Sequence, residues 1–141
     1  MDFFTALNIF SSGLGAERVR LNVTASNLAN ANTTRGADGR AYRRRDPVFQ
    51  LVELEGRDPF EDQLRDAVAS VEVSEVVTDR DPPRTIYDPA HPDANADGYV
   101  ELPNVNMIEE MVNMITAARA YEANVTAMRT LVDMARKTLE R

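Results

Sequence analysis

Ten apolar residues near the C-terminus follow one another at alternating spacings of four and three, and this pattern leaves few choices of fold. They are Met107, Met111, Met114, Ala118, Tyr121, Val125, Met128, Val132, Ala135 and Leu139. Such spacing lines apolar side chains along one side of a helix, as in a coiled coil. The repeat predicts a long amphipathic helix, about 50 Å long at 1.5 Å per residue. This helix packs either on its own domain's core or, as the strict spacing favours, against another helix.

The residues around this repeat supply signals for both ends of the helix. Asn106 followed by Glu109 is typical of an N-cap with a reciprocal acidic side chain. Arg136, Lys137 and Arg141 lie near the end, where positive charge suits the helix dipole. We therefore expect residues 104–141 to form the C-terminal helical segment.

A weaker apolar repeat begins the chain, with one leucine every seven residues. The leucines are Leu7, Leu14, Leu21 and Leu28. The pattern predicts a helix from about residue 4 to about residue 30, within an N-terminal segment of residues 1–34. Gly13 and Gly15 each cost a helix about 1 kcal/mol relative to alanine, which predicts a kink or weak turn there. Asn27, Asn30 and Asn32 mark the helix end, because asparagine tolerates the conformation that terminates helices.

All seven prolines lie between Pro47 and Pro103, so the middle, residues 35–103, is expected to contain short strands and loops. Residues 47–54 and 71–77 are strand candidates, and the acidic stretch at 55–66 is a loop or a short helix. The predicted fold is mainly α, with long N- and C-terminal helices pairing as a coiled-coil-like hairpin and a small β/loop insertion between them. Two helices alone leave apolar surface uncovered, which indicates a partner.

Charge is unevenly distributed within the overall net charge of −7. Residues 1–45 carry +4, residues 46–103 carry −11 and residues 104–141 are neutral. The acidic middle disfavours nucleic acid, whose binding requires neutralisation of phosphates. No apolar stretch is long enough to span a membrane as a helix, and the N-terminus lacks the basic start of a cleavable signal.

The chain contains few residues of the kinds that act as nucleophiles or bind metal ions. There is no cysteine and only one histidine, His91, which excludes disulfides and cysteine- or histidine-cluster metal sites. No nucleophile elbow, dinucleotide-binding or phosphate-binding motif is present, so we expect no enzyme and no cofactor. Residues 93–98 match the first half of an EF-hand loop, but its twelfth position is Asn104 rather than glutamate. An acidic Asp-Gly turn is the simpler interpretation, and no metal site is predicted.

Five arginines fall within eleven residues after the first predicted helix, at positions 35, 40, 43, 44 and 45. They suit a nucleic-acid or lipid surface, ion pairs with acidic groups, or a solvated loop. The acidic segment that follows favours the second or third interpretation. We predict that Arg43, Arg44 and Arg45 pair with carboxylates of a neighbouring subunit, with internal pairing left as an alternative.

Two stretches of the chain are similar to a known family. Residues 18–35, RVRLNVTASNLANANTTR, and residues 109–125, EEMVNMITAARAYEANV, resemble the signatures of bacterial flagellar rod and hook proteins. The short chain, the string YRRR at 42–45 and the segment YDPAHPDANADGYV at 87–100 are most similar to proximal-rod members.

The resemblance implies a structural subunit of the flagellar basal body. Such subunits pass through the flagellar type III export channel without a cleaved signal and assemble helically across the periplasm. Their terminal helices form the inner tube around the export channel. The expected partners are other rod proteins, copies of itself, membrane-ring or rod-adaptor proteins and the export apparatus.

The terminal repeats and the asparagines therefore become the predicted assembly interface. Its residues are Leu7, Leu14, Leu21, Asn27, Leu28, Asn30, Asn32, Met111, Met114, Ala118, Tyr121, Val125, Met128, Val132 and Leu139. A cytoplasmic coiled-coil adaptor or secretion chaperone would show the same stripes. Only the rod family explains the asparagine-rich helix end together with the Tyr-Glu-Ala-Asn string near the other terminus.

Overall fold

The computed structural model describes residues 3–53 and 69–140. Its elements in chain order are α1 (Phe3–Ala29), β1 (Arg45–Glu53), β2 (Ala69–Thr78), β3 (Arg84–Tyr87), β4 (Tyr99–Leu102) and α3 (Met107–Leu139). The expected loop or short helix at 55–66 lies outside the described residues. Both terminal helices and both strand candidates of the middle are confirmed in type and approximate position.

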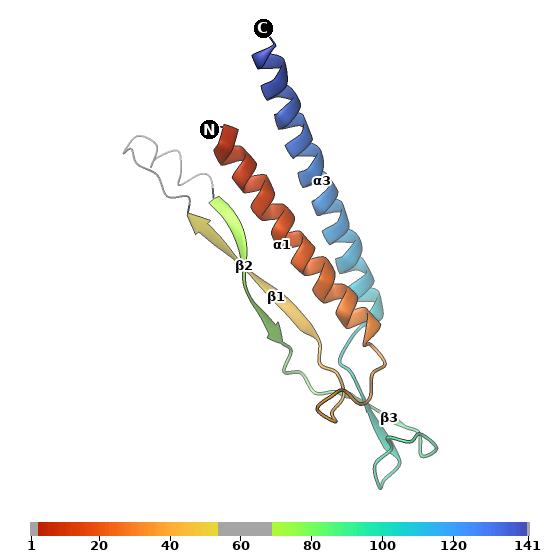
Figure 1. Cartoon of the computed structure of the whole chain (residues 1–141). Helices are drawn as coiled ribbons and strands as arrows, with labels where there is room; N and C mark the ends of the chain where they lie inside the picture. Colours follow the sequence, from red (N-terminus) through yellow and green to blue (C-terminus); the bar gives the residue numbers. More distant parts are fainter. Residues whose placement is uncertain (1–2, 54–68, 141) are drawn as a thin grey trace.

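The molecule is an elongated antiparallel helix pair with a β-hairpin laid along one side (Figure 1). α1 lies between α3 and the hairpin of β1 and β2, and it contacts both. A second small hairpin, β3 with β4, projects at the end opposite the two chain termini (Figure 1). The predicted helical hairpin with a small β/loop insertion is therefore confirmed.

The first helix runs unbroken for 27 residues, so the turn predicted near its glycines is wrong. Gly13 has a packing role, because a Cβ at this position would lie 3.0 Å from the side-chain nitrogen of Asn124 on α3. The missing side chain lets the two helices approach closely there. Gly15 has no such neighbour within 4 Å. Tertiary packing on both sides of α1 outweighs the low helix propensity of the two glycines.

This difference predicts unequal effects of adding a methyl group to each glycine. We expect Gly15→Ala to raise the free energy of unfolding by up to about 1 kcal/mol, the usual advantage of alanine over glycine inside a helix. Gly13→Ala gains less, because Asn124 has to move to accommodate the new methyl group. Urea unfolding of the two variants measures the difference. Equal stabilisation would show that the helices are not tightly apposed at Gly13.

The second long helix begins as its sequence predicts. Asn106 is its N-cap, with an extended backbone and a side-chain oxygen that accepts a hydrogen bond from the backbone N–H of Ile108. Glu109 and Glu110 lie in the first turn, and Arg136 and Lys137 lie in the last, which complements the helix dipole at both ends.

The strands form two separate antiparallel pairs. β1 pairs with β2 from Arg45 opposite Thr78 to Glu53 opposite Ala69, with one irregularity between Val48 and Phe49. β3 and β4, of four residues each, had no sequence signal of their own, since such short strands show no clear alternation. Their connection uses Gly98 at φ +83°, a conformation that favours glycine.

Candidate assembly site

The face of α3 that packs on α1 is rotated relative to the predicted apolar stripe. One heptad row of the prediction does turn toward α1 and is half-buried; it comprises Met114, Tyr121, Met128 and Ala135. The most buried second row is not the one that begins at Met111, in which Ala118 and Val125 are half-buried but Met111, Val132 and Leu139 are exposed. It is the row one residue earlier, with Glu110, Ala117, Asn124 and Leu131 buried or half-buried. Ala117 is fully buried, and a charged residue, Glu110, is 1% exposed beside α1.

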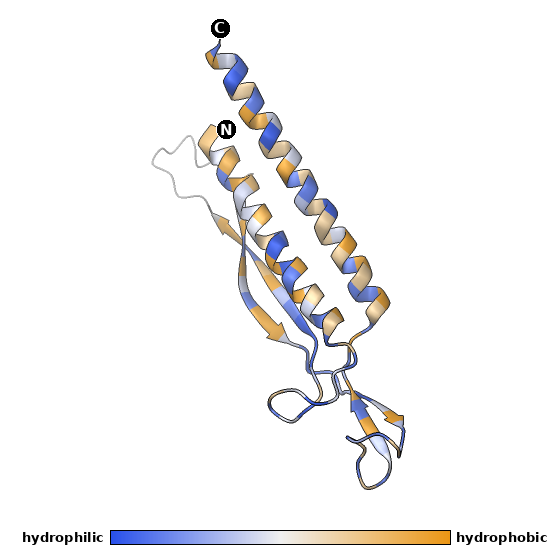
Figure 2. Cartoon of the chain, turned by 45° about the vertical axis from the view of Figure 1, so that its right-hand side comes forward, coloured by the Kyte–Doolittle hydropathy of each residue, from blue (hydrophilic) through white to orange (hydrophobic). Residues whose placement is uncertain are grey.

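The rotation leaves apolar side chains of α3 uncovered near both ends of the helix. We call the exposed residues Ile108, Met111, Val112, Ile115, Val132 and Leu139 the outer stripe. Ile108, Val112 and Ile115 are 56–70% exposed, although their spacing is that of one helix face. Figure 2 shows hydrophobic residues recurring along the whole of α3, whose main neighbour among the described elements is α1. Large apolar side chains that are grouped and exposed in this way are typical of an interaction surface.

The leucines of α1 are half-buried rather than central to the helix pair. Leu7, Leu14, Leu21 and Leu28 are all of intermediate exposure, while Ala6, Ala16, Thr24 and Asn27 are the buried residues of α1. Small and polar side chains therefore form the buried part of this helix. The predicted leucine row keeps some accessible surface for a partner.

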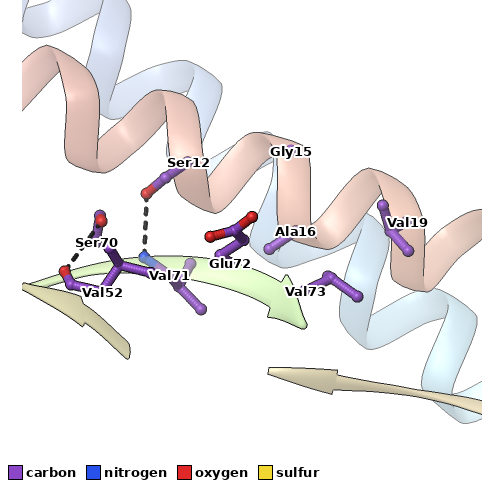
Figure 3. A pocket seen from close by; sticks show the side chains of 9 residues that line it. All are labelled: Ser12, Gly15, Ala16, Val19, Val52, Ser70, Val71, Glu72 and Val73. Carbon is purple, nitrogen blue, oxygen red and sulfur yellow. Dashed lines mark hydrogen bonds between the residues drawn. The ribbon is translucent and has the colours of Figure 1, made fainter. Parts of the chain in front are cut away.

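A groove of about 440 Å³ opens between α1 and β2. Figure 3 shows its lining, including Ala16 and Val19 from α1 and Val71 and Val73 from β2. The backbone N–H of Val71 donates to the hydroxyl oxygen of Ser12, at 3.2 Å, which fixes the hairpin on the helix. The groove is mostly apolar and contains no group of convergent polar side chains suited to catalysis.

A partly buried polar cluster lies where the two helices meet the hairpins. Asn27, at the end of α1, donates to a carboxylate oxygen of Glu110 at 3.0 Å and to the backbone carbonyl of Arg45 at 2.8 Å. Its side-chain oxygen accepts from the hydroxyl of Tyr42 at 2.9 Å and from the backbone N–H of Arg45 at 3.0 Å. All the hydrogen-bonding capacity of the buried Asn27 side chain is therefore used within the chain.

Arg44 completes this cluster from the opposite side of Glu110. Its Nε donates to the other carboxylate oxygen of Glu110 at 2.6 Å. Its terminal nitrogen contacts Asp46 and lies 3.8 Å from Asp79. We call Asn27, Tyr42, Arg44, Asp46 and Glu110 the polar junction. It joins α1, α3 and the start of β1, which are far apart in the sequence.

Burial and charge act in opposite directions on the ionisable groups of the polar junction. Desolvation lowers the pKa of Arg44, but its hydrogen bond to Glu110 and the nearby carboxylates outweigh this and raise that pKa. Desolvation also raises the pKa of Asp46, and the opposing effect of Arg44 does not fully cancel it. Arg44 therefore stays charged and holds the cluster together.

The predicted arginine contacts divide into two groups. Arg44 is engaged inside its own chain, which is the internal alternative left open above. Arg43 and Arg45 are exposed; Arg43 makes one long contact with the backbone carbonyl of Asp79, and Arg45 lies over the Tyr42 ring. Contacts of Arg43 and Arg45 with another subunit stay a prediction.

The other predicted asparagines lie just beyond the polar junction. Asn30 bonds to the carbonyl of Ser26 and accepts from the hydroxyl of Thr33, whereas Asn32 is exposed. Sequence patterns missed Glu110 and Tyr42 as partners of Asn27, because the contact joins residues 83 positions apart and a charged residue is rarely expected inside.

The EF-hand-like segment uses its polar side chains for local bonds. Asp93 accepts from the hydroxyl of Thr34 at 2.7 Å and lies 3.5 Å from Arg35, while Asn95 accepts from the backbone of Asp97 and Tyr99. Across the described residues, no three histidine, cysteine or acidic side chains gather where a metal ion could be held. In the same part of the chain, no helix has the length and apolar character needed to cross a membrane.

Comparisons with known proteins agree on one family. Residues 7–37 match the family described as "Flagella basal body rod protein", and residues 96–141 match "Flagellar basal body rod FlgEFG protein C-terminal". The flagellar basal-body rod protein FlgC of Borreliella burgdorferi is 42% identical, with 99% of this chain and 97% of the relative covered. FlgC of Salmonella typhimurium is 42% identical over 94% of this chain and 95% of the relative. FlgC of Bacillus subtilis is 40% identical over 99% of this chain and 98% of the relative.

Proposed function

Because this chain belongs to the flagellar basal-body rod proteins of the FlgC type, it is a structural subunit of the rod, and we propose that its terminal helices assemble it with other rod proteins and with copies of itself. Its place is the flagellar basal body, and its role is mechanical rather than enzymatic.

The observation that supports assembly through the helices is the outer stripe. α3 buries one side on α1 and leaves Ile108, Val112 and Ile115 largely exposed. Helices of neighbouring subunits would cover these side chains, at about 25 cal/mol per Å² of apolar surface before the ordering costs of association. Such contacts join different faces of successive subunits, so they generate a helical polymer rather than a closed oligomer.

This proposal gives the terminal segments and the middle of the chain different roles in the rod. Residues 1–34 and 104–141 form one discontinuous helical domain that faces the export channel. Residues 35–103 form the middle region, which contacts neighbours farther from the channel. The further partners that we propose are membrane-ring or rod-adaptor proteins at one end of the rod and the export apparatus during delivery.

Isolation of basal bodies tests the proposed assembly. A strain that lacks this protein is complemented with a tagged copy, and hook–basal bodies are purified. We expect the tagged chain to co-isolate with the rod and to restore motility. Recovery only in the cytoplasm, bound to unassembled flagellar proteins, would instead support the adaptor or chaperone alternative.

The exposed arginines give a salt-dependent prediction. We expect the double variant Arg43→Ser, Arg45→Ser to assemble rods that lose integrity at high ionic strength, because exposed ion pairs contribute only about 0–1 kcal/mol each and the remaining ones are screened by salt. Arg44 is left intact, since it belongs to the polar junction. Electron microscopy of basal bodies washed in increasing salt measures the loss. Identical salt tolerance of variant and unmodified rods would contradict inter-subunit pairing.

A further inference from the structure

The small hairpin of β3 and β4 has one face that its own chain leaves open. The hairpin projects at the end opposite the two termini (Figure 1), and among the described elements its strands contact mainly each other. Tyr87 lies opposite Tyr99, and Thr85 lies opposite Glu101. Opposite residues of an antiparallel pair, and residues two positions apart in a strand, lie on the same side of the sheet. We call these four residues the hairpin face, and all four are exposed.

Two closely packed aromatic rings occupy the hairpin face. Tyr87 is 66% exposed and Tyr99 is 47% exposed, and their rings meet edge to face with centroids 5.3 Å apart. A Cβ on Gly98 would lie 2.8 Å from a ring carbon of Tyr87, so the glycine allows this ring to lie against the turn. Because rings that are already held in place lose little freedom on binding, such tyrosines are typical of the centre of a binding surface.

The charge of this part of the chain is negative. Residues 85–101 include four acidic residues and neither lysine nor arginine. Asp93 is engaged with Thr34 and Arg35, but Glu101 lies on the hairpin face beside the rings. A guanidinium fits both features, because it stacks on an aromatic ring and pairs with a carboxylate through two parallel hydrogen bonds. The hairpin face is therefore suited to an arginine-bearing partner.

The chain itself shows what such a partner surface looks like. The segment that follows α1 exposes Arg40, Arg43 and Arg45. The aromatic and acidic hairpin face and this basic segment are complementary in charge, and they lie at different places on one chain. Complementary surfaces of this kind join subunits through unlike faces, as an open helical polymer requires.

We propose that the hairpin face docks on the exposed arginines that follow the first helix of a neighbouring rod subunit, with a guanidinium stacked on Tyr87 and paired with Glu101. This inference rests on the assembly proposed above, and it concerns contacts in the assembled rod. It supplies a specific acceptor for the inter-subunit ion pairs that the sequence predicts. The hairpin face is separate from the outer stripe of α3, so the two surfaces contact different parts of neighbouring subunits.

Site-specific photo-cross-linking in assembled basal bodies tests this proposal. In the complementing copy of the protein, the exposed Thr85 of the hairpin face is replaced by the photoreactive amino acid benzoylphenylalanine. Basal bodies are purified and irradiated, and the linked peptides are identified by mass spectrometry. We expect a link to an arginine-containing peptide of another rod subunit, from the segment that follows its first helix.

Variants of the same copy test the chemistry of the contact. Glu101→Lys should reduce the yield of this link at least about fivefold, because like charges then face each other. Changing the linked arginine to glutamate in the same strain should restore it. Glu75→Lys, an equal change at an exposed position of β2, is the matched control and should leave the yield unchanged. Tyr87→Leu should also reduce the yield, since leucine is apolar but offers no ring to a guanidinium.

The possible results separate this inference from the proposed function. If the chain does not co-isolate with basal bodies, the proposed function is wrong and the inference falls with it. If the chain co-isolates, two results overturn the inference alone. The first is a link confined to its own chain or to a peptide without arginine. The second is a link whose yield is unchanged by Glu101→Lys.

Discussion

Ile115→Asp is expected to abolish swimming while the isolated subunit remains as stable as the unmodified chain. Ile115 is 56% exposed in the outer stripe, so an aspartate there faces water in the free subunit. In the rod the same side chain would lie against a neighbouring helix, where an unpaired carboxylate costs several kcal/mol. Because the contact recurs in every subunit, even a moderate cost prevents polymerisation.

Motility agar and electron microscopy of basal bodies measure this effect, and urea unfolding of the purified subunit checks its stability. Asn113→Asp, which adds the same charge at an exposed position of the same helix outside the outer stripe, is the matched control and should swim normally. We expect Val125→Asp to block assembly as well, but Val125 is half-buried, so its subunit also loses stability. Normal motility of Ile115→Asp would show that the outer stripe is not a contact surface.

Glu110→Ala is expected to lower the free energy of unfolding by about 3–5 kcal/mol, the usual cost of removing one partner from a buried ion pair. The change leaves the guanidinium of Arg44 and the amide of Asn27 without their buried acceptor. Domains of this size have a free energy of unfolding of about 5–15 kcal/mol, so the substitution removes a large part of it. The variant should therefore express poorly or unfold at low urea concentration.

Urea titration followed by circular dichroism measures the change. Glu122→Ala is the control, because Glu122 is exposed on the same helix and should alter stability by no more than about 0.5 kcal/mol. If Glu110→Ala loses less than about 1 kcal/mol, the polar junction is not a major source of stability.

The sequence predicted the elements of this fold better than their contacts. Both long helices followed from the heptad repeats and from the confinement of proline to the middle, and Asn106 was identified as the N-cap that it is. β1 and β2 followed from apolar runs and alternation. β3 and β4 did not, because four-residue strands carry too little pattern.

The position of the helix contact could not be predicted from apolar spacing. A repeat with spacings of four and three predicts that the most apolar rows of α3 face α1. In the structure, the row of Glu110 and Asn124, which contains both polar and apolar residues, lies against α1 instead. The signal for this lies in pairs of distant residues: Glu110 needs Asn27 and Arg44, and Asn124 needs Gly13. A single sequence contains no indication of such pairing. The glycine that suggested a broken helix instead marks a close helix contact.

A reconstruction of the assembled rod tests most directly whether this subunit polymerises through the uncovered face of α3. At side-chain resolution, we predict that Ile108, Val112 and Ile115 are buried against helices of neighbouring subunits, while Glu110 keeps Asn27 and Arg44 of its own chain. An outer stripe that faces solvent or the open channel in the assembled rod would contradict this account.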